Sequence, residues 1–559
     1  MKTSVALKKV LFMLSFLLPG STLLILPYSV SDPINLPKMV VLVVCSGVLA
    51  GILLSNTKEL AQPKHHQIHI LISLFCLNLL ILLYVFRDTF GEIFYGVPGR
   101  NTGVVTYLAF LIVMLASVHI SSDSSIARVF KLLFGCGLVL IVYGFVQAIG
   151  LEPFPYVNIY ESDVFGTFGN PNFQSAFLGM VSVLLVPYIL LNQLGVAYRI
   201  AGGLLLLAAL YGIELTNSIQ GFFNFIIGTA VMTFLYFRLK SFKLLSSLTL
   251  FLTFIGIVSI SAAFFKVGPL ADLIYKGSMA ARVYYWDTAF RIASDNPFFG
   301  VGPDKYGDWL RRYRSASEVQ TNLTADSSHS VYLDILSGGG FPLFTIYLGI
   351  TALTLISIFK TVKRLEGVNI LFICLVGLWV SHQAQSLISI GQIGVAVWGW
   401  VFSGLLIGYE IHTRPKALSS ETPSGKKQAL AGNDALAAKA LVAGALGLMV
   451  GLLVALPPFV TAQRYYTSFK SGNGEIIKAA TVAKPYNRNS FIYTISAFQS
   501  NKYTAEALSL AEQAVKHFPN SYNSWKLLLD LAPVDSLLSK QAFSKLHELD
   551  PNNPAYIKP

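Results

Sequence analysis

The long polar segment between residues 265 and 330 contains one histidine, His329, which stands directly before an apolar block that begins near residue 331. Imidazole titrates close to neutral pH, so a neutral histidine at this position can take a proton from an incoming hydroxyl group. We therefore predict that His329 acts as a general base. The alternative is a structural histidine at a membrane interface.

Three arginines are candidates for binding an anionic group: Arg282, Arg291 and Arg100. A guanidinium group pairs bidentately with phosphate oxygens, which suits a diphosphate leaving group. Arg282 and Arg291 are nine residues apart, about two and a half turns of an ideal helix, so they need not face the same ligand. The alternatives are surface pairing with Asp287 or Asp295, and snorkelling of Arg100 at the interface.

Two polar stretches interrupt the apolar blocks, GTFGNPNFQS at 166–175 and ELTNSIQGFF at 214–223. Polar groups at membrane depth are costly unless they face a cavity, so these stretches are candidates for binding sugar hydroxyls or phosphate oxygens. The side chains concerned are Asn170, Asn172, Gln174, Asn217, Ser218 and Gln220, with Glu214 as a further cavity-facing candidate. For Asn170 the alternative is a helix cap, with proline at the first helical position.

The sequence lacks the residues that several other kinds of chemistry need. The chain has no glycine-rich phosphate-binding loop, which argues against an ATP-driven pump. Asp304 and Asp308 are separated by Lys305 and followed by two arginines, so we expect no metal site and no cofactor. The four cysteines lie inside apolar blocks without metal-ligand spacing, and we interpret them as buried small hydrophobic residues.

The candidate residues are set among apolar blocks of membrane length. Of the 559 residues, 54% are apolar and 12% are charged, against roughly 25% charged in a soluble domain, which excludes a soluble globule. A bilayer core of about 30 Å needs about 20 helical residues. We predict an all-α, polytopic membrane helix bundle of about 12–13 spans, at residues 10–30, 39–54, 69–86, 103–120, 129–149, 173–192, 200–217, 221–237, 244–264, 331–358, 368–389, 391–411 and 438–462.

Basic residues fall in alternate loops, as the excess of Lys and Arg in cytoplasmic loops requires. If the N-terminus is inside, the outer short loops hold only Lys38, Arg87 and Arg100. This assignment puts residues 265–330 and everything after about 463 on the outer side. The net charge of +13 lies mainly in short loops, so no nucleic-acid partner is expected. The inner loops hold Lys58, Lys64, Arg128, Arg199, Arg238, Lys240, Lys243, Lys360, Lys363, Arg364, Arg414, Lys416, Lys426 and Lys427.

The long outer loop is predicted to be structured, because a loop of this size in a compact protein is usually functional. Residues 281–294 have helical spacing, with Ala281, Tyr285, Ala289 and Ile292 on one face. The Asn296-Pro297 pair should end this helix, and the GVG sequence at 300–302 should supply a flexible turn.

The chain is thus predicted to have four parts: N-terminal membrane helices at 1–264, a large loop at 265–330, C-terminal membrane helices at 331–462 and a tail at 463–559. In the tail, YTAEALSLAEQAVKHFPNSYNSWKLLLDLAP predicts two helices joined by a turn. The similar sequences KHFPNS and HELDPNNP lie about 30 residues apart, close to the tetratricopeptide period. The tail is predicted either to cap and solubilise the protein or to dock a partner or acceptor.

The order of motifs in the loop has a counterpart in a known family. Arg282, Trp286 and Ala289 are followed by NPFFGVGPDKYG, and then by the pair His329-Ser330, with nine residues between that pair and Gly340. This order resembles the O-antigen ligase and polymerase family of bacterial envelope proteins. The likeness covers roughly residues 80–410, and a tetratricopeptide-like tail is a common addition in this group.

The resemblance implies a membrane glycosyltransferase of the GT-C type in the bacterial inner membrane, with the long loop and the tail in the periplasm. Such an enzyme takes a glycan from an undecaprenyl-diphosphate carrier and moves it, without a metal and with inversion, to a lipid or protein acceptor. By this resemblance His329 matches the candidate general base, and Arg282 is the best match to a diphosphate-binding arginine.

One position departs from the family pattern. Many relatives carry an arginine after the serine equivalent to Ser218, where this chain has Ile219-Gln220. Diphosphate binding would then fall to other groups: Arg282, Arg291, Arg100 or an amide such as Gln220.

The sequence leaves several functions open. A ligase that attaches glycan to a lipid, a polymerase of lipid-linked repeat units and a protein glycosyltransferase all use the same donor and the same loop. A transporter of lipid-linked sugar would share the cavity and the positive charge but would not need His329. A scaffold acting through its tail would depend on residues 463–559 instead.

Overall fold

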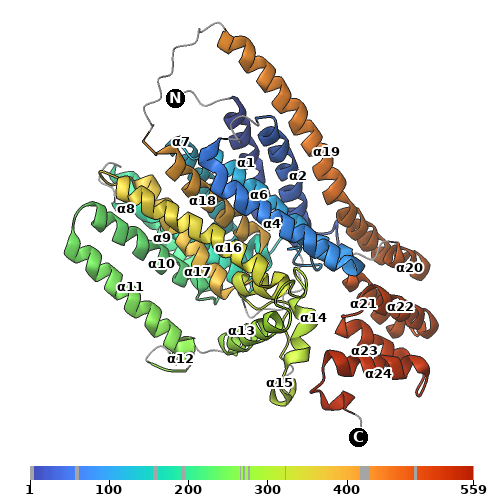
Figure 1. Ribbon diagram of the computed structural model, residues 1–559. Helices are drawn as coiled ribbons and strands as arrows, with labels where there is room; N and C mark the ends of the chain where they lie inside the picture. The colour runs from blue at the N-terminus through green and yellow to red at the C-terminus, as the bar shows by residue number, and fades with distance from the viewer. Residues whose placement is uncertain are drawn as a thin grey trace.

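The computed structural model describes residues 5–56, 62–154, 162–190, 195–264, 266–268, 271–274, 277–320, 323–415, 428–483 and 487–557. Within these ranges the regular elements are all helices, as predicted, and they form a long bundle with smaller helices at one end (Figure 1). Lys58, Lys416, Lys426 and Lys427, which were used to assign the inner side, lie outside the described residues.

Thirteen long helices occupy the thirteen predicted positions. Eleven of them are long and apolar enough to cross a membrane, and α6 is a shorter apolar helix, so the chain is a multi-pass membrane protein. The thirteen are α1 (Val5–Leu23), α2 (Asn35–Leu54), α4 (His66–Val85), α6 (Val104–His119), α7 (Asp123–Ala148), α8 (Pro171–Leu190), α9 (Val196–Leu215), α10 (Gln220–Leu239), α11 (Lys243–Phe264), α16 (Val331–Arg364), α17 (Ile370–Ile388), α18 (Ile393–His412) and α19 (Gln428–Ser471).

The bundle is arranged around α18, which packs against α1, α6, α16 and α17, while α11 lies at the edge (Figure 1). Helix α19 packs closely along α2, and a Cβ atom added to Gly47 would come within 2.3 Å of the carbonyl oxygen of Gly447. Small residues of this kind let two membrane helices approach at backbone distance.

The two ends of the bundle differ in their polar groups. At one end Arg364 and Arg414 both pair with Glu410, at 2.9 Å and 2.6 Å. At the opposite end of α16, Arg100 pairs with Asp334 in the first turn of the helix. We call this second end the loop end, because the 265–330 segment folds over it.

The 265–330 segment forms short helices with a core of their own: α12 (Ala271–Ile274), α13 (Gly277–Asp295), α14 (Tyr306–Leu310) and α15 (Ala316–Gln320). The predicted helix at 281–294 is confirmed, and α13 ends directly before Asn296-Pro297 as expected. Its predicted apolar face packs against α14, in a cluster that contains Tyr285, Ala289, Ile292, Val301, Tyr306 and Leu310.

The segment after α13 is fixed to α16 by backbone hydrogen bonds. The Val301 and Gly302 N–H groups donate to the carbonyl oxygens of Ser337 and Gly338, at 2.9 Å each. Gly340 interrupts α16 with a positive φ of 69°, a conformation that glycine adopts at little steric cost. The GVG turn is therefore not a free hinge, because it is paired with the glycine-rich kink of α16.

The tail consists of α20 (Gly474–Val482), α21 (Arg488–Ser500), α22 (Thr504–His517), α23 (Tyr522–Leu531) and α24 (Leu537–Leu549). The predicted pair of helices separated by a Pro/Asn turn is confirmed by α22 and α23, which pack as a hairpin. The tetratricopeptide resemblance stays a prediction. Helix α19 continues to Ser471, so the expected start of the tail at 463 lies inside a continuous helix.

Charged residues attach the tail to the loop. Arg314 of the loop and Asp550 of the tail form an ion pair whose side chains are 1% and 0% exposed. Arg312 pairs with Glu548 at 3.0 Å, and Asn552 donates to the Arg314 carbonyl at 2.6 Å. The loop helices and α21–α24 accordingly lie together at the loop end (Figure 1).

Asp550→Asn should weaken the docking of the tail, because it leaves the buried Arg314 guanidinium without a charged partner. Removing one member of a buried ion pair costs about 3–5 kcal/mol. Native-state hydrogen exchange of α24 in the detergent-solubilised full chain would measure this loss. The control is Asp530→Asn, which breaks an exposed i,i+4 pair with Lys526 and should cost under about 1 kcal/mol. Equal protection in the two variants would contradict tight docking.

Candidate active site

His329 lies in the turn that leads into α16. Its φ is 56°, in the left-handed region that few residues other than glycine adopt. Its ring stacks on Tyr285 of α13, with centroids 5.4 Å apart and planes 19° apart, and its backbone N–H donates to the Ser327 hydroxyl at 3.1 Å. The imidazole is therefore held between two elements that are 44 residues apart in the sequence.

Asp334 organises this turn from the first turn of α16. One carboxylate oxygen accepts hydrogen bonds from the N–H and the hydroxyl of Ser328, at 2.8 Å and 2.9 Å. The other accepts from the Ser327 hydroxyl at 2.6 Å. A carboxylate near a helix N-terminus is also favoured by the helix dipole. Asp334 thus determines the backbone path that presents His329.

Arg100 connects this turn to two other segments. Its Nε lies 2.8 Å from Asp304, its Nη2 lies 3.4 Å from Asp334, and its Nη1 donates to the Asp326 carbonyl at 2.9 Å. The Arg100 side chain is only 13% exposed. Of the two alternatives for Arg100, anion binding or snorkelling, the contacts match neither directly, because two carboxylates already neutralise its charge.

Among the candidate arginines, Arg282 has the largest electrostatic effect on the pKa of His329. It is 4% exposed on α13, one turn before Tyr285, and burial lowers its pKa to about 10. Burial, and next the positive charge of Arg282, lowers the pKa of His329 to about 4. The imidazole is consequently neutral at pH 7 and has a lone pair available to accept a proton.

Arg291 lies apart from this cluster. It is exposed on α13 and pairs with Asp287 at 2.7 Å, the surface pairing considered as its alternative. Asp295, the other candidate partner, accepts a hydrogen bond from the Tyr313 hydroxyl at 2.9 Å. Nine residues are about two and a half turns of α13, so Arg282 lies in the buried cluster while Arg291, on the opposite face of the helix, lies in solvent.

The two polar stretches meet, as the prediction of a shared cavity requires. The Ser218 hydroxyl donates to Asn172 Oδ1 at 2.7 Å, and the Ser175 hydroxyl donates to the Ser218 carbonyl at 2.8 Å. Asn170 accepts from the Asn172 N–H at 2.9 Å while Pro171 begins α8, which is the capping arrangement considered for Asn170. Asn217 and Glu214 are exposed.

Gln220 belongs to a chain of buried amides at the start of α10. Gln385 of α17 donates to Gln220 Oε1 at 2.9 Å, and Asn224 donates to Gln385 Oε1 at 3.3 Å. All three side chains are buried, and Gln220 Nε2 and Asn224 Oδ1 have no hydrogen-bond partner among the described residues. Unused buried polar atoms of this kind suit a polar ligand or bridging water.

Gln174 uses its amide differently, because its Nε2 donates to the Leu140 carbonyl at 3.0 Å, which fixes α8 to α7.

The acidic residues of the GPDKYGDW sequence are engaged by cations. Asp308 pairs with Lys305 at 3.1 Å and with Arg488 of the tail. Lys305 also pairs with Glu92. In the part of the chain that the structure describes, no group of three His, Cys, Asp or Glu residues is arranged to hold a metal ion.

Sequence reasoning missed four residues of this region: Asp334, Tyr285 as the ring partner of His329, and the amides Asn224 and Gln385. Asp334 had a usable signal, because an acidic residue in the first turn of a helix that follows Ser327 and Ser328 suggests a capping arrangement. The ring stacking and the amide chain join distant elements and have no local signal.

Comparison with known proteins agrees with the resemblance drawn from the sequence. Residues 203–348 match the family model described as O-antigen ligase. The matched range contains Ser218, Gln220, Arg282, His329 and Asp334, and it ends within α16 beyond the kink at Gly340. A search of curated proteins gives no match.

Arg100→Gln should loosen the His329 turn, because it leaves Asp304 and Asp334 buried without their shared cation. We expect a loss of about 3–5 kcal/mol in stability, as for other buried pairs, and faster proteolysis of residues 323–330. Arg87→Gln is the control, because Arg87 is exposed and lies over the Tyr84 ring. If thermal unfolding and proteolysis of the two variants were the same, Arg100 would not connect these segments.

Proposed function

We propose that this multi-pass membrane protein, in which residues 203–348 match the O-antigen ligase family model, transfers a glycan from an undecaprenyl-diphosphate carrier to an acceptor. The observation that carries the proposal is the neutral imidazole of His329 beside the buried cation Arg282, within the matched range. A base and a cation are the two groups that such a transfer needs.

The chemistry of the transfer assigns a role to each group. The lipid diphosphate is already a good leaving group, so the protein has to neutralise its developing charge and orient the acceptor oxygen behind the anomeric carbon. His329 takes the proton of the acceptor hydroxyl as the new glycosidic bond forms and the bond to the diphosphate breaks. Attack from the face opposite the leaving group inverts the anomeric centre, and no metal is required.

Arg282 is the best candidate for the cationic contact with the diphosphate. Arg291 is a weaker candidate because Asp287 already neutralises it, and Arg100 acts through its two carboxylate partners by positioning the His329 turn. The amides of Gln220 and Asn172 at the meeting point of the polar stretches would hold sugar hydroxyls or phosphate oxygens, with Asn170 supporting Asn172.

The proposed location is a bacterial inner membrane, with the loop end and the tail in the periplasm. The support for this is the distribution of basic loops, together with the separation of Arg364 and Arg414 from the loop end. The acceptor is a lipid or a protein. Ligation, polymerisation and protein glycosylation differ only in that acceptor, so analysis of the product linkage separates them.

His329→Asn tests the general base while preserving the turn, because asparagine tolerates a positive φ better than most residues. With purified protein, an undecaprenyl-diphosphate-linked glycan, an acceptor and EDTA, we expect transfer by the native protein and a decrease of about 10²–10⁴-fold in the variant. His547→Asn, at an exposed position in the tail, is the control. Normal transfer by His329→Asn would show that His329 is not the general base. Movement of the carrier by the native protein, without any glycan transfer, would identify a transporter.

The pH dependence of kcat/KM offers a second test. Protonated imidazole cannot accept a proton, so activity should be lost as the pH falls through the pKa of His329, at about 4. Arg282→Gln removes a nearby positive charge and should move this acidic limb part of the way to higher pH, because burial, the larger cause, still lowers the pKa of His329. Arg291→Gln, which changes an exposed arginine of the same helix, should leave the limb in place. An unshifted acidic limb in Arg282→Gln would show that the charge of Arg282 does not affect the pKa of His329.

A further inference from the structure

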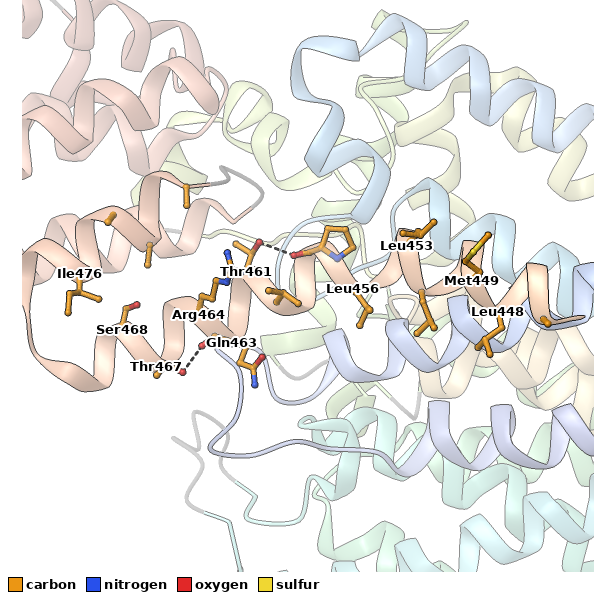
Figure 2. Close-up of a pocket in the computed structure, with 17 residues that line it drawn as sticks. Leu448, Met449, Leu453, Leu456, Thr461, Gln463, Arg464, Thr467, Ser468 and Ile476 are labelled. Carbon is orange, nitrogen blue, oxygen red and sulfur yellow. Dashed lines mark hydrogen bonds between the residues drawn. The ribbon is translucent and has the colours of Figure 1, made fainter.

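A large groove lies away from the His329 turn, at the elbow between α19 and α20. Its volume is about 1120 Å³, above the range of roughly 300–1,000 Å³ that is usual for small-molecule sites. Residues of α19 from Ala445 to Ser468 form one wall, and Ile476, Ala479, Ala480 and Ala483 form the other (Figure 2). No residue of the proposed active site lines it.

One half of the groove is apolar and belongs to the membrane-spanning part of α19. Leu448, Met449, Leu453 and Leu456 line this half and are 41%, 52%, 69% and 39% exposed. The face of α19 that contacts α2 carries Gly447 instead. The apolar half of the groove is therefore accessible to the hydrocarbon of a bilayer.

The other half is polar and contains one cation, Arg464, with Gln463 and Ser468 beside it (Figure 2). Among the described residues Arg464 forms no ion pair, and its side chain is exposed. The hydroxyls of Thr461 and Thr467 donate to helix carbonyls at 2.8 Å and 2.9 Å. Arg464, Gln463 and Ser468 are thus the groups in position to contact a polar head.

The spacing of the two halves matches a lipid. Leu453 and Arg464 are eleven residues apart on one helix, or about 17 Å at 1.5 Å per residue. The hydrocarbon of one leaflet is about 15 Å thick. An acyl chain along the leucines therefore brings its phosphate to the level of Arg464.

We propose that this groove binds an anionic phospholipid of the surrounding bilayer, whose head group carries one phosphate and no positive charge. A single exposed arginine complements one phosphate, and the amide and hydroxyl beside it suit a glycerol head group. The bound lipid would contact both α19 and α20 and would hold the two helices together. Because Arg488, at the start of α21, pairs with Asp308 of the loop, the same lipid would support the docking of the tail.

Photolabelling of the full-length protein in phosphatidylcholine vesicles tests this site. Two probes with the same diazirine acyl chain are compared, a phosphatidylglycerol and a phosphatidylcholine, and labelled peptides from residues 445–483 are quantified. We expect stronger labelling by the anionic probe. Arg464→Gln should reduce that labelling about five-fold, the effect of one basic residue near a membrane surface, and should leave the phosphatidylcholine signal unchanged.

Lys470→Gln is the matched control, because it removes a charge from the same helix outside the groove. Leu453→Trp fills the exposed apolar half and should reduce labelling by both probes while Arg464 remains, which keeps the test valid if Arg464→Gln folds poorly. Equal labelling by both probes in the native protein would overturn the proposal. So would displacement of the anionic probe by an equimolar polyisoprenyl diphosphate, which would assign the groove to the carrier.

Discussion

The structure of the loop end depends on one constraint: burying a charged group is costly unless an opposite charge neutralises it. Arg100 meets this constraint by joining Asp304 and Asp334 in a place where its side chain is 13% exposed. A buried pair of this kind adds little net stability, but it strongly penalises any arrangement that separates its members. Ion pairing therefore selects one path for the chain over the ends of the membrane helices.

That path decides the state of His329. Asp334 holds the preceding serines, and the turn places the imidazole against Tyr285 in a poorly solvated position. Burial and the charge of Arg282 then keep the ring neutral. The same low polarity that makes unpaired charges costly thus keeps the imidazole of His329 unprotonated at neutral pH.

Elements that are distant in the sequence are coupled by the same means. Glu92, Lys305, Asp308 and Arg488 bring the segment before α6, the long loop and the tail into one network of opposite charges. The tail is consequently part of the structure that supports the loop. A lipid at the α19–α20 elbow would act on this network from the membrane side.

The sequence by itself determined the helices, because hydrophobic blocks of about 20 residues admit only a helix in a bilayer. It also identified His329 and Arg282 of the long loop as candidates, together with the two polar stretches, whose residue types are unusual at membrane depth. The sequence could not predict the contacts of those residues. The stacking of His329 on Tyr285, and the burial of Arg282 rather than Arg291, follow from how α13 packs on α16.

The amide chain of Gln220, Gln385 and Asn224 makes the same point. Its members are up to 165 residues apart and meet only because α10 packs against α17. Periodicity and motif spacing describe one element at a time, so the sequence determined which groups are available, and tertiary packing decided which of them share a site. The physical reason is that hydrogen bonds and ion pairs act over a few ångströms in space, whatever the distance along the chain.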